Sequence, residues 1–409
     1  MCPEEAIKIV LNDKKGTYEP KLIEGKCKGC GICLEVCPGH EVDFRQVYMD
    51  IFSKEPSNNL IGNCLACYTG YSTNYDIRYY SSSGGLVTQL LLFALENGII
   101  DGALVTRMKK EDPLNPDSFI ARTKEEIIEA QGSKYCPVPS NIVLNKILKS
   151  KEGERFAVVG LPCQIHGVRK AQKVNKILKE RIVLCFGLFC GAYSNFNGIE
   201  FLLDSIGVKS KDITCINFRG LGWPGNLSII GRNGINIKIP YVEYSSTLGS
   251  AFFPVRCTLC IDALNEFADI SFGDAWLKEY LSDSIGTSIC IARTSIGLNL
   301  LKKAKIADKI SLTLILKEKL IESQSSLLKF KKRDQNAHRL LCNIMDCMAL
   351  PEYHLNEHEI KSLTKRSFLA SCSLYIQILI GKNRFLWSVL RIISKVRSKG
   401  YSLLKPPLN

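Results

Sequence analysis

An apolar stretch passes directly into a helix start at Phe156-Ala157-Val158-Val159-Gly160-Leu161-Pro162-Cys163-Gln164. Four apolar residues in a row predict a buried strand. Pro162 suits the first turn of a helix, where its missing N–H leaves no hydrogen bond unmade. Cys163 then falls in that first turn, where the helix dipole stabilises a thiolate. The segment therefore predicts a strand, a short loop and a helix, with a cysteine at the carboxyl end of the strand.

Other apolar runs flank this segment and alternate with helical patterns. The strand-like runs are 102–105, 182–185 and 268–271, and the helical patterns are 86–97, 123–131 and 168–179. This alternation predicts an α+β or mixed α/β core. The chain has 409 residues, of which 46% are hydrophobic and 23% charged, so it is not largely disordered and has room for two or three domains. No apolar run approaches the ~20 residues that a membrane-spanning helix needs.

A cysteine motif lies near the N-terminus: Cys27-Lys-Gly-Cys30-Gly-Ile-Cys33-Leu-Glu-Val-Cys37-Pro38. This is the bacterial ferredoxin spacing for a 4Fe-4S cluster. Gly29 and Gly31 allow backbone amides to approach the sulfur atoms. A zinc site is the alternative, but it needs neither the third cysteine at this spacing nor the Cys-Pro that follows. The motif favours an N-terminal ferredoxin-like iron–sulfur module.

The first residues bear on how many clusters this module holds. In two-cluster ferredoxins the fourth cysteine of such a run binds the other cluster. Cys2-Pro3 reads like the end of a preceding motif, so Cys2 is expected to complete the set of Cys27, Cys30 and Cys33. Cys37 would then lack partners, and we expect either a truncated start or a degenerate first motif. Cys64-Leu-Ala-Cys67 supplies two more thiols, as ligands or as small buried residues.

Four further cysteines follow strand-like runs or form a short pair: Cys163, Cys190, Cys257 and Cys260. They are candidates for one core cluster; a zinc knuckle and buried cysteines without ligands are the alternatives. The chain has 18 cysteines and no basic, apolar leader at Met1-Cys2-Pro3-Glu4-Glu5. A cytoplasmic location is therefore predicted, where clustered cysteines more often serve metal or redox chemistry than disulfides.

Several motifs, taken together and in order, resemble the coenzyme F-420 hydrogenase/dehydrogenase beta-subunit family over about residues 20–330. They are Ser82-Ser83-Gly84-Gly85, Gly132-Ser133-Lys134-Tyr135, Gly160-Leu161-Pro162-Cys163-Gln164, Phe218-Arg219-Gly220-Leu-Gly222-Trp223-Pro224-Gly225 and Arg256-Cys257-Thr-Leu-Cys260-Ile-Asp262 running on to Gly273-Asp274-Ala275-Trp276. The resemblance implies an FAD enzyme with one or two 4Fe-4S clusters, which passes electrons to a two-electron carrier such as coenzyme F-420.

The same resemblance implies a set of flavin-binding residues. These are Ser82, Ser83, Gly84, Gly85, Thr88, Ser133, Lys134, Tyr135, Arg219 and Trp223. Lys134 would stabilise a reduced flavin or bind a phosphate, or else be a solvated surface lysine. Arg219 and Trp223 would bind an anionic or planar ligand, or else belong to a packed turn. The residues that carry catalysis are not assigned.

The charge is concentrated at the C-terminus. The formal net charge is +14, and residues 361–409 hold 10 Lys and Arg and no acidic residue, against 44 basic and 40 acidic residues before them. A general nucleic-acid-binding face is therefore not predicted. Apolar residues at helical spacing alternate with basic ones in this tail: Phe385, Leu386, Val389, Leu390, Ile393 and Val396 with Arg384, Arg391, Lys395, Arg397 and Lys399. This pattern predicts a basic amphipathic helix for a membrane surface or a partner, or a helix packed on the core.

These observations lead to one division of the chain and one leading function. We expect a ferredoxin-type module at 1–70, a flavin-binding core at 71–335 and a helical extension with a basic tail at 336–409. The predicted function is an iron–sulfur flavoprotein oxidoreductase that works with a redox partner: a ferredoxin, a hydrogenase or a dehydrogenase subunit. A flavin-free electron-transfer adaptor and a zinc-stapled scaffold are the alternatives.

Overall fold

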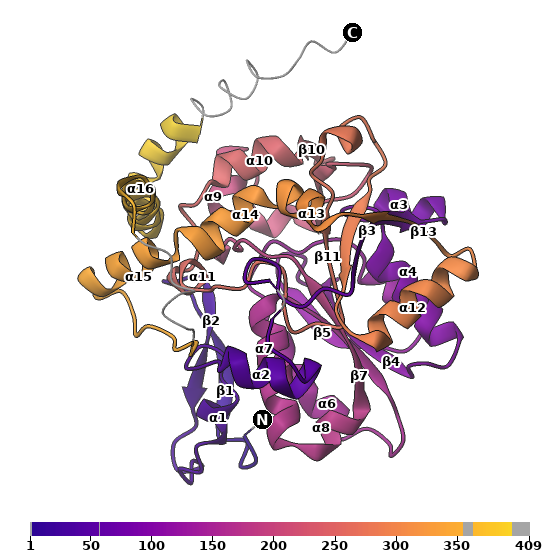
Figure 1. Cartoon of the computed structure of the whole chain (residues 1–409). Coiled ribbons are helices and arrows are strands. Elements are labelled where there is room, and N and C mark those ends of the chain that lie inside the picture. The colour runs from indigo at the N-terminus through magenta and orange to yellow at the C-terminus, as the bar shows by residue number, and fades with distance from the viewer. Residues whose placement is uncertain (1, 57, 355–362, 395–409) are drawn as a thin grey trace.

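The computed structural model describes residues 2–56, 58–354 and 363–394. Its core is an eight-stranded sheet (Figure 1). The strands are β3 (Ala66–Ser72), β4 (Gly102–Met108), β5 (Pro116–Ala121), β6 (Phe156–Gly160), β7 (Ile182–Leu188), β11 (Ile270–Asp274), β12 (Ser288–Ala292) and β13 (Ile310–Ile315). Their order across the sheet is β13-β3-β12-β11-β7-β6-β4-β5.

Five of these strands run in the same direction. The neighbours β11, β7, β6 and β4 are mutually parallel, and β3 joins them in direction because β12 is antiparallel to both β3 and β11. Their carboxyl ends therefore lie along one edge, which we call the carboxyl edge. Ligand sites of α/β sheets lie at such an edge.

Helices cover both faces of the sheet. Successive side chains of each strand point to opposite faces, so every strand contributes to both apolar layers. Ala103 and Phe186 pack in one apolar layer with α4 (Leu86–Glu96) and α12 (Ser295–Ile306). Leu104 and Cys185 pack in the opposite layer. The helices on that second face are α2 (Phe44–Phe52), α6 (Leu144–Leu148), α7 (Pro162–Val174) and α8 (Lys176–Arg181). The mixed α/β core predicted from the alternating pattern is confirmed.

The helix predicted over 168–179 differs from the structure. The helix begins at Pro162, as the segment Phe156–Gln164 predicts, but it ends before residue 179 because it breaks at Asn175, whose φ of −136° is extended. Asn175 caps α8 because its side chain accepts a hydrogen bond from the Leu178 N–H. Asparagine is a strong N-cap residue. The spacing of apolar residues alone does not show that one helix ends and another begins at such a residue.

The N-terminal segment forms a hairpin of β1 (Ile7–Asn12) and β2 (Thr17–Leu22), followed by the short helix α1 (Ile32–Glu35). The hairpin turn docks on α9 (Phe196–Ser205), since the Gly16 carbonyl accepts from the Phe196 N–H at 2.8 Å. The predicted domain boundary at residue 70 falls inside β3, which is an internal strand of the core sheet. The division into domains stays a prediction.

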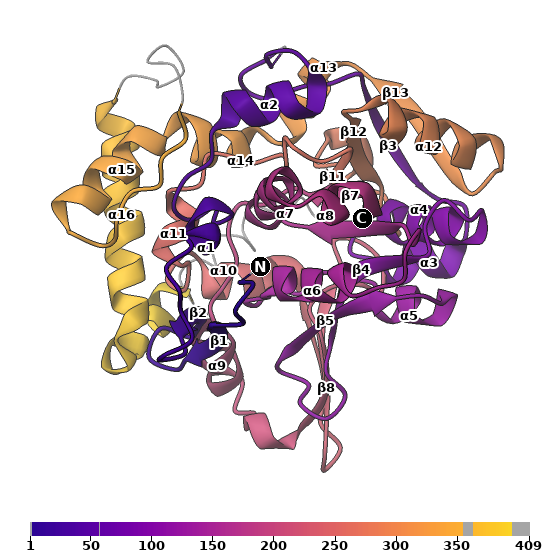
Figure 2. The same cartoon turned by 90° about the horizontal axis from the view of Figure 1, so that it is seen from below.

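A second, smaller sheet flanks the core. It contains β8 (Ile213–Asn217), β9 (Asn226–Gly231) and β10 (Asn236–Pro240), and it packs with α9 and α10 (Tyr241–Leu248). The remaining helices are α3 (Tyr75–Tyr80), α5 (Lys124–Glu129), α11 (Val255–Thr258), α13 (Lys317–Ser323), α14 (Ser325–Leu328), α15 (Gln335–Ile344) and α16 (Lys365–Lys382). Figures 1 and 2 both place α15 and α16 on the side that carries the β1–β2 hairpin.

The structure describes the C-terminal tail only as far as residue 394. Trp387 and Leu390 are buried with Phe201 and Phe252 of the small-sheet layer, so part of the tail packs on the core. Arg384 and Arg391 pair with Glu200 and Asp204 of α9. Lys395, Val396, Arg397 and Lys399 lie outside the described residues. Within residues 2–56, 58–354 and 363–394, no helix combines the length and apolar character that crossing a membrane requires.

Candidate functional site

Four cysteines meet at the carboxyl edge of the sheet. Cys163 lies in the first turn of α7 just after β6, and Cys190 lies just after β7. Cys257 belongs to α11, and Cys260 follows two residues after that helix ends. The Cys190 N–H donates to the Ala263 carbonyl at 2.9 Å, which holds the loop after Cys260 against the end of β7. We call Cys163, Cys190, Cys257 and Cys260 the core thiols.

The core thiols lie close enough to affect one another's ionisation in every pairing. Withdrawal from bulk water, together with the neighbouring Cys260 and Cys257, raises the pKa of Cys163 to about 12. Burial and the other three thiols hold the pKa of Cys190 well above its usual range, and burial and Cys260 raise the pKa of Cys257. By accessible surface Cys163 is exposed and Cys190, Cys257 and Cys260 are partly exposed, so the set lies at the surface of the sheet edge and not in the core. Several thiolates crowded together repel one another, so the set needs a cation or a metal centre to become fully ionised.

The donor set and its spacing fit an iron–sulfur cluster. Tetrahedral zinc brings its four thiolates to about 3.8 Å from one another, whereas the thiolates of a cubane cluster each bind a different iron and stand farther apart. Among the described residues, no three core thiols lie within 4.8 Å of one another. Four cysteine thiols at one place fit the ligand set of a cubane cluster, in which each thiolate binds a different iron.

Two cations border the core thiols. Lys331 is 2% exposed and donates to the Cys257 carbonyl at 2.5 Å, and its charge lowers the pKa of Cys163, Cys190 and Cys257 against the effect of burial. Arg256 precedes Cys257 and acts in the same direction on Cys163 and Cys257. These cations offset the negative charge of the thiolate set.

The N-terminal cysteines form a separate group. One hollow is lined by Cys2, Cys27, Cys30 and Cys33, together with Glu4, Ala6, Ile7, Leu22, Lys28 and Gly31. The Ala6 N–H points at the Cys2 Sγ at 3.3 Å, and Gly31 starts α1 with a φ of 77°. The structure thus brings Cys2 to the three cysteines that the spacing predicted as its partners. We call these four the N-terminal thiols.

Cys37 does not line this hollow. A Cβ added to Gly39 would stand 3.3 Å from the Cys37 Sγ and 3.6 Å from the Arg256 Nε, so the Cys37 thiol lies toward Arg256. Arg256 donates to the Pro38 carbonyl at 2.5 Å and to the Tyr353 hydroxyl at 3.0 Å. This arginine therefore connects the chain after the N-terminal thiols to the segment that carries Cys257 and Cys260.

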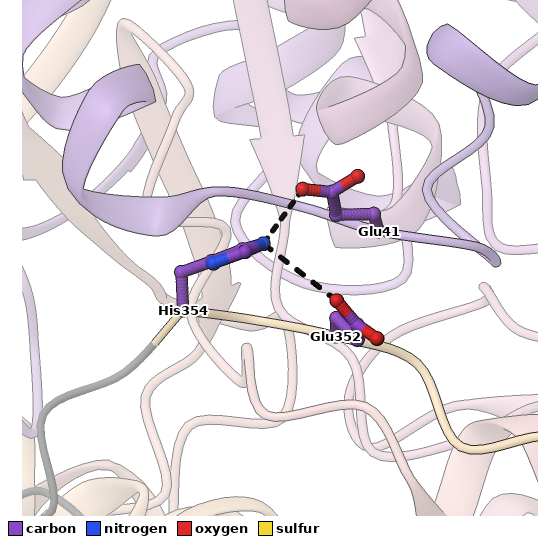
Figure 3. Close-up of side chains that lie close together, drawn as sticks. All are labelled: Glu41, Glu352 and His354. Atoms are coloured by element: carbon purple, nitrogen blue, oxygen red, sulfur yellow. Dashed lines mark hydrogen bonds and ion pairs between the residues drawn. The ribbon is translucent and has the colours of Figure 1, made fainter.

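A short strap from the C-terminal extension reinforces this connection. The Val42 N–H donates to the Glu352 carbonyl at 2.8 Å, and Glu41 lies 2.6 Å from the Nε2 of His354 (Figure 3). Glu41, Glu352 and His354 form the only group in the described ranges whose ligand atoms are close enough for a single metal ion. All three side chains are substantially exposed. The contact of His354 with the two glutamates is therefore a surface ion pair and not a metal site.

The predicted flavin residues gather on loops at the same edge. The Ser133 N–H donates to the Ser82 hydroxyl at 2.8 Å, and the Gly84 N–H donates to Ser288 at the start of β12 at 2.9 Å. Gly85 begins α4 with a φ of 77° and with no side chain capping the helix. The first amides of α4 are therefore left without a side-chain acceptor, which suits a phosphate. Thr88 lies in the first turn of α4 and is buried.

Arg219 and Trp223 share an anchor that the sequence did not reveal. Asp274, the last residue of β11, accepts from Arg219 Nη1 at 2.8 Å and Nη2 at 3.2 Å, and from Trp223 Nε1 at 3.2 Å. Arg219 is 4% exposed and also donates to the Tyr135 hydroxyl at 3.2 Å. Asp274 was visible only as part of a motif, because a pairing across 55 residues of sequence has no local signature.

Lys134 does not behave as a solvated surface lysine. Its ammonium donates to the carbonyls of Ala130, Gln131 and Gly132 at 2.5, 3.0 and 2.9 Å, and burial lowers its pKa to about 7. The group closes the end of α5 and is held against the loop that carries Ser133 and Tyr135. Its direct role toward a ligand stays a prediction.

An α/β sheet with four cysteines and phosphate-suited loops at its carboxyl edge fits an oxidoreductase or electron-transfer subunit. Two family models match the chain: the N-terminal part of the coenzyme F420 hydrogenase/dehydrogenase beta subunit over residues 67–145, and its C-terminal part over 153–317. Together they cover more than half of the sequence. The chain therefore belongs to the coenzyme F420 hydrogenase/dehydrogenase beta-subunit family, which confirms the resemblance seen in its motifs.

Individual relatives agree with this assignment. The beta subunit of coenzyme F420 hydrogenase from Methanothermobacter thermautotrophicus is 28% identical over 250 residues, which cover 60% of this chain and 83% of that protein. The coenzyme F420-dependent sulfite reductase of Methanocaldococcus jannaschii is 28% identical over 359 residues, or 77% of this chain and about half (52%) of that enzyme.

A solved structure shares the fold. A chain of the F420-reducing nickel–iron hydrogenase complex from Methanosarcina barkeri superposes with a TM-score of 0.55 at 21% identity, covering 74% of this chain and 99% of that one. At this identity the likeness concerns the fold.

Proposed function

We propose that this chain passes electrons between 4Fe-4S clusters and, through FAD, a two-electron carrier such as coenzyme F-420 or another small organic acceptor. The observation that carries the proposal is the meeting of four core thiols at the carboxyl edge of the sheet, where the loops suited to a phosphate also lie. When bound, a cluster supplies one-electron transfer and a flavin couples it to two-electron chemistry.

Different residues of the chain are proposed to bind the two clusters and the flavin. The core thiols hold one cluster, and Lys331 and Arg256 offset its negative charge. The N-terminal thiols hold a second cluster, and the Ala6 N–H donates to one of its ligands, Cys2. Ser82 and the first amides of α4 bind the flavin phosphate, whereas the Ser83 hydroxyl donates to the Thr287 carbonyl at 3.0 Å and holds the loop in place. Arg256 fixes the two thiol groups relative to each other, because it binds the Pro38 carbonyl while flanking Cys257.

One observation favours a flavin-free adaptor as the second candidate. The two cations predicted to meet the flavin have internal partners: Lys134 binds three backbone carbonyls, and Arg219 binds Asp274. An adaptor would need the two thiol groups and no flavin. It would transfer single electrons between partner proteins.

An acceptor assay separates the two candidates. The full chain is reconstituted anaerobically with iron, sulfide and FAD, reduced with dithionite and desalted. Oxidised coenzyme F-420 or a one-electron viologen is then added, and its absorbance is followed. The proposal predicts reduction of both acceptors, and omission of FAD abolishes only the F-420 reaction. Viologen reduction alone, with FAD supplied, would establish the adaptor.

A prediction about the N-terminal ligands follows from the hollow that they line. Cys2→Ser and Cys30→Ser each lower the bound iron of the reconstituted chain by about four atoms, because each removes a ligand of one cluster. Cys37→Ser, which alters a thiol outside the hollow, leaves the iron count unchanged. Iron and sulfide analysis checks this. Equal loss in Cys37→Ser and no loss in Cys2→Ser would assign the fourth ligand to Cys37 instead.

The partner protein is proposed to be another redox subunit, as in the hydrogenase relatives. The C-terminal tail is proposed to make a further contact with a membrane surface. Phe385, Val389 and Ile392 lie on one face of the last described helical segment and are 93%, 41% and 65% exposed. Such an apolar face beside basic residues suits the interface of anionic lipids.

Vesicle sedimentation tests this contact. We expect the full chain to sediment with vesicles that contain anionic lipid, and Phe385→Asp with Ile392→Asp to lower the bound fraction severalfold. Ile306→Asp serves as the matched control, since Ile306 is 86% exposed at the end of α12, away from the tail. If the wild type does not bind the vesicles, or if the double variant binds them equally well, the proposed membrane contact is disproved.

A further inference from the structure

The function proposed above makes no use of Cys64 and Cys67. Their sulfur atoms lie 3.2 Å apart, and both residues belong to the apolar cluster that also contains Leu264 and Ala275. Cys67 is the second residue of β3, whereas Cys64 precedes the strand. The pair is thus built into the core sheet and is separate from the N-terminal thiols.

We propose that Cys64 and Cys67 are a redox-active dithiol, which closes reversibly to a disulfide in exchange with the disulfide of a small thiol. Closure needs the two sulfurs to move from 3.2 Å to about 2.05 Å. Two cysteines separated by two residues are a common arrangement for thiol–disulfide exchange. The proposal does not depend on clusters or flavin being bound.

The two thiols differ in the way that such an exchange requires. Cys64 is 9% exposed and precedes the strongly exposed Leu65, whereas Cys67 is 2% exposed within the sheet. The hydrogen bond from Cys67, followed by the charges of Arg293 and Lys317, lowers the pKa of Cys64 to about 7 although burial opposes this. The same hydrogen bond, burial and the nearby Cys64 and Cys290 raise the pKa of Cys67.

Arg293 gives this asymmetry a fixed structural basis. Its side chain is fully buried, and it donates to the carbonyls of Ile61 and Asn63 at 2.8 and 2.7 Å and to the Leu264 carbonyl at 2.8 Å. These partners are neutral carbonyls, so the guanidinium keeps a positive field next to the loop that carries Cys64. A nearby cation favours the thiolate, which is the attacking form.

The exchange balances without any group from the cluster sites. The Cys64 thiolate attacks the external disulfide, forms a mixed disulfide and releases one thiolate of the small thiol. Cys67 then gives up its proton and attacks the Cys64 sulfur, which forms the internal disulfide and releases the second thiol. The protein loses two electrons and two protons, and the external disulfide is reduced to two thiols.

A single tryptic peptide reports the result. Cleavage after Lys54 and after Arg78 releases residues 55–78, in which Cys64 and Cys67 are the only cysteines. The full chain is equilibrated anaerobically in glutathione–glutathione disulfide mixtures, quenched with an alkylating agent and analysed by mass spectrometry. We expect this peptide to lose two hydrogens and to escape alkylation under oxidising mixtures, and to recover both alkylation sites after treatment with dithiothreitol.

Single variants test the order of attack. Cys67→Ser should accumulate a glutathione adduct on Cys64, whereas Cys64→Ser should leave Cys67 without one. Cys290→Ser is the matched control, because Cys290 is fully buried beside the pair and should not change disulfide formation. Full alkylation of both residues in the most oxidising mixture would overturn the proposal, and so would an adduct that forms on Cys67 but not on Cys64. The far-ultraviolet circular dichroism of each variant verifies that it is folded.

Discussion

Cys257→Ser is expected to halve the iron and sulfide bound by the reconstituted chain, from about eight to about four atoms of each. Cys257 is the core thiol whose own backbone adjoins both cations of the site, since it follows Arg256 and its carbonyl accepts from Lys331. Losing this ligand removes the core cluster while the N-terminal thiols stay intact. Electron delivery to coenzyme F-420 should fall to background, because the core cluster is proposed to supply the flavin bound at the same edge of the sheet.

The matched control is Cys215→Ser, which alters a half-buried cysteine of β8 in the small sheet. Its iron count and its rate of F-420 reduction should equal those of the wild type. An unchanged iron count in Cys257→Ser would contradict the assignment of the core thiols. A loss of all iron in that variant would show instead that the two centres assemble together.

Asp274→Ala is expected to destabilise the chain by about 3–5 kcal/mol and to abolish flavin binding. Arg219 is 4% exposed, and the carboxylate of Asp274 is the only acidic group within 4 Å of it among the described residues. Removing that carboxylate leaves a buried guanidinium uncompensated and frees the loop that carries Trp223. Urea unfolding of the apoprotein gives the free energy, and flavin retention after gel filtration gives the binding.

Two controls make the result specific to the buried pair. Asp117→Ala breaks the pair with Arg107, whose side chains are 29% and 38% exposed, and should cost at most about 1 kcal/mol. Arg219→Met combined with Asp274→Leu replaces the buried charges by apolar groups and should restore most of the stability without restoring flavin binding. A stable Asp274→Ala chain that keeps its flavin would contradict the role given to this anchor.

The strands of the core sheet could be located from the sequence, but their order across the sheet could not. Continuous apolar runs such as 156–159 and 182–185 mark strands buried on both faces, and they proved to be β6 and β7. The placement of β3 between β12 and β13 has no local signal, since its partners lie more than 200 residues away in the chain. The cap at Asn175 was hidden because it interrupts an otherwise regular helical pattern.

The part of the candidate site that directly follows the parallel strands could be predicted from the sequence. Cys163 and Cys190 follow parallel neighbours β6 and β7, so their convergence at one edge follows from the topology. The partnership of Arg219 with Asp274 was not predictable, because the two residues meet only when the small-sheet region packs on the core. The three carbonyls around Lys134 lie within four residues of it, but they converge only through the loop after α5 and its left-handed Gly132, with a φ of 82°.

The most direct test of the central claim is an anaerobic absorbance spectrum of the purified full chain, with iron, sulfide, zinc and flavin counted per chain. If both thiol groups hold a cluster and the loops bind a flavin, the chain contains about eight iron atoms, about eight sulfides and one FAD, with the broad visible absorption of iron–sulfur clusters beneath the flavin bands. Zinc without sulfide or flavin would rule out the proposed clusters and flavin and would leave the two thiol groups as structural metal sites.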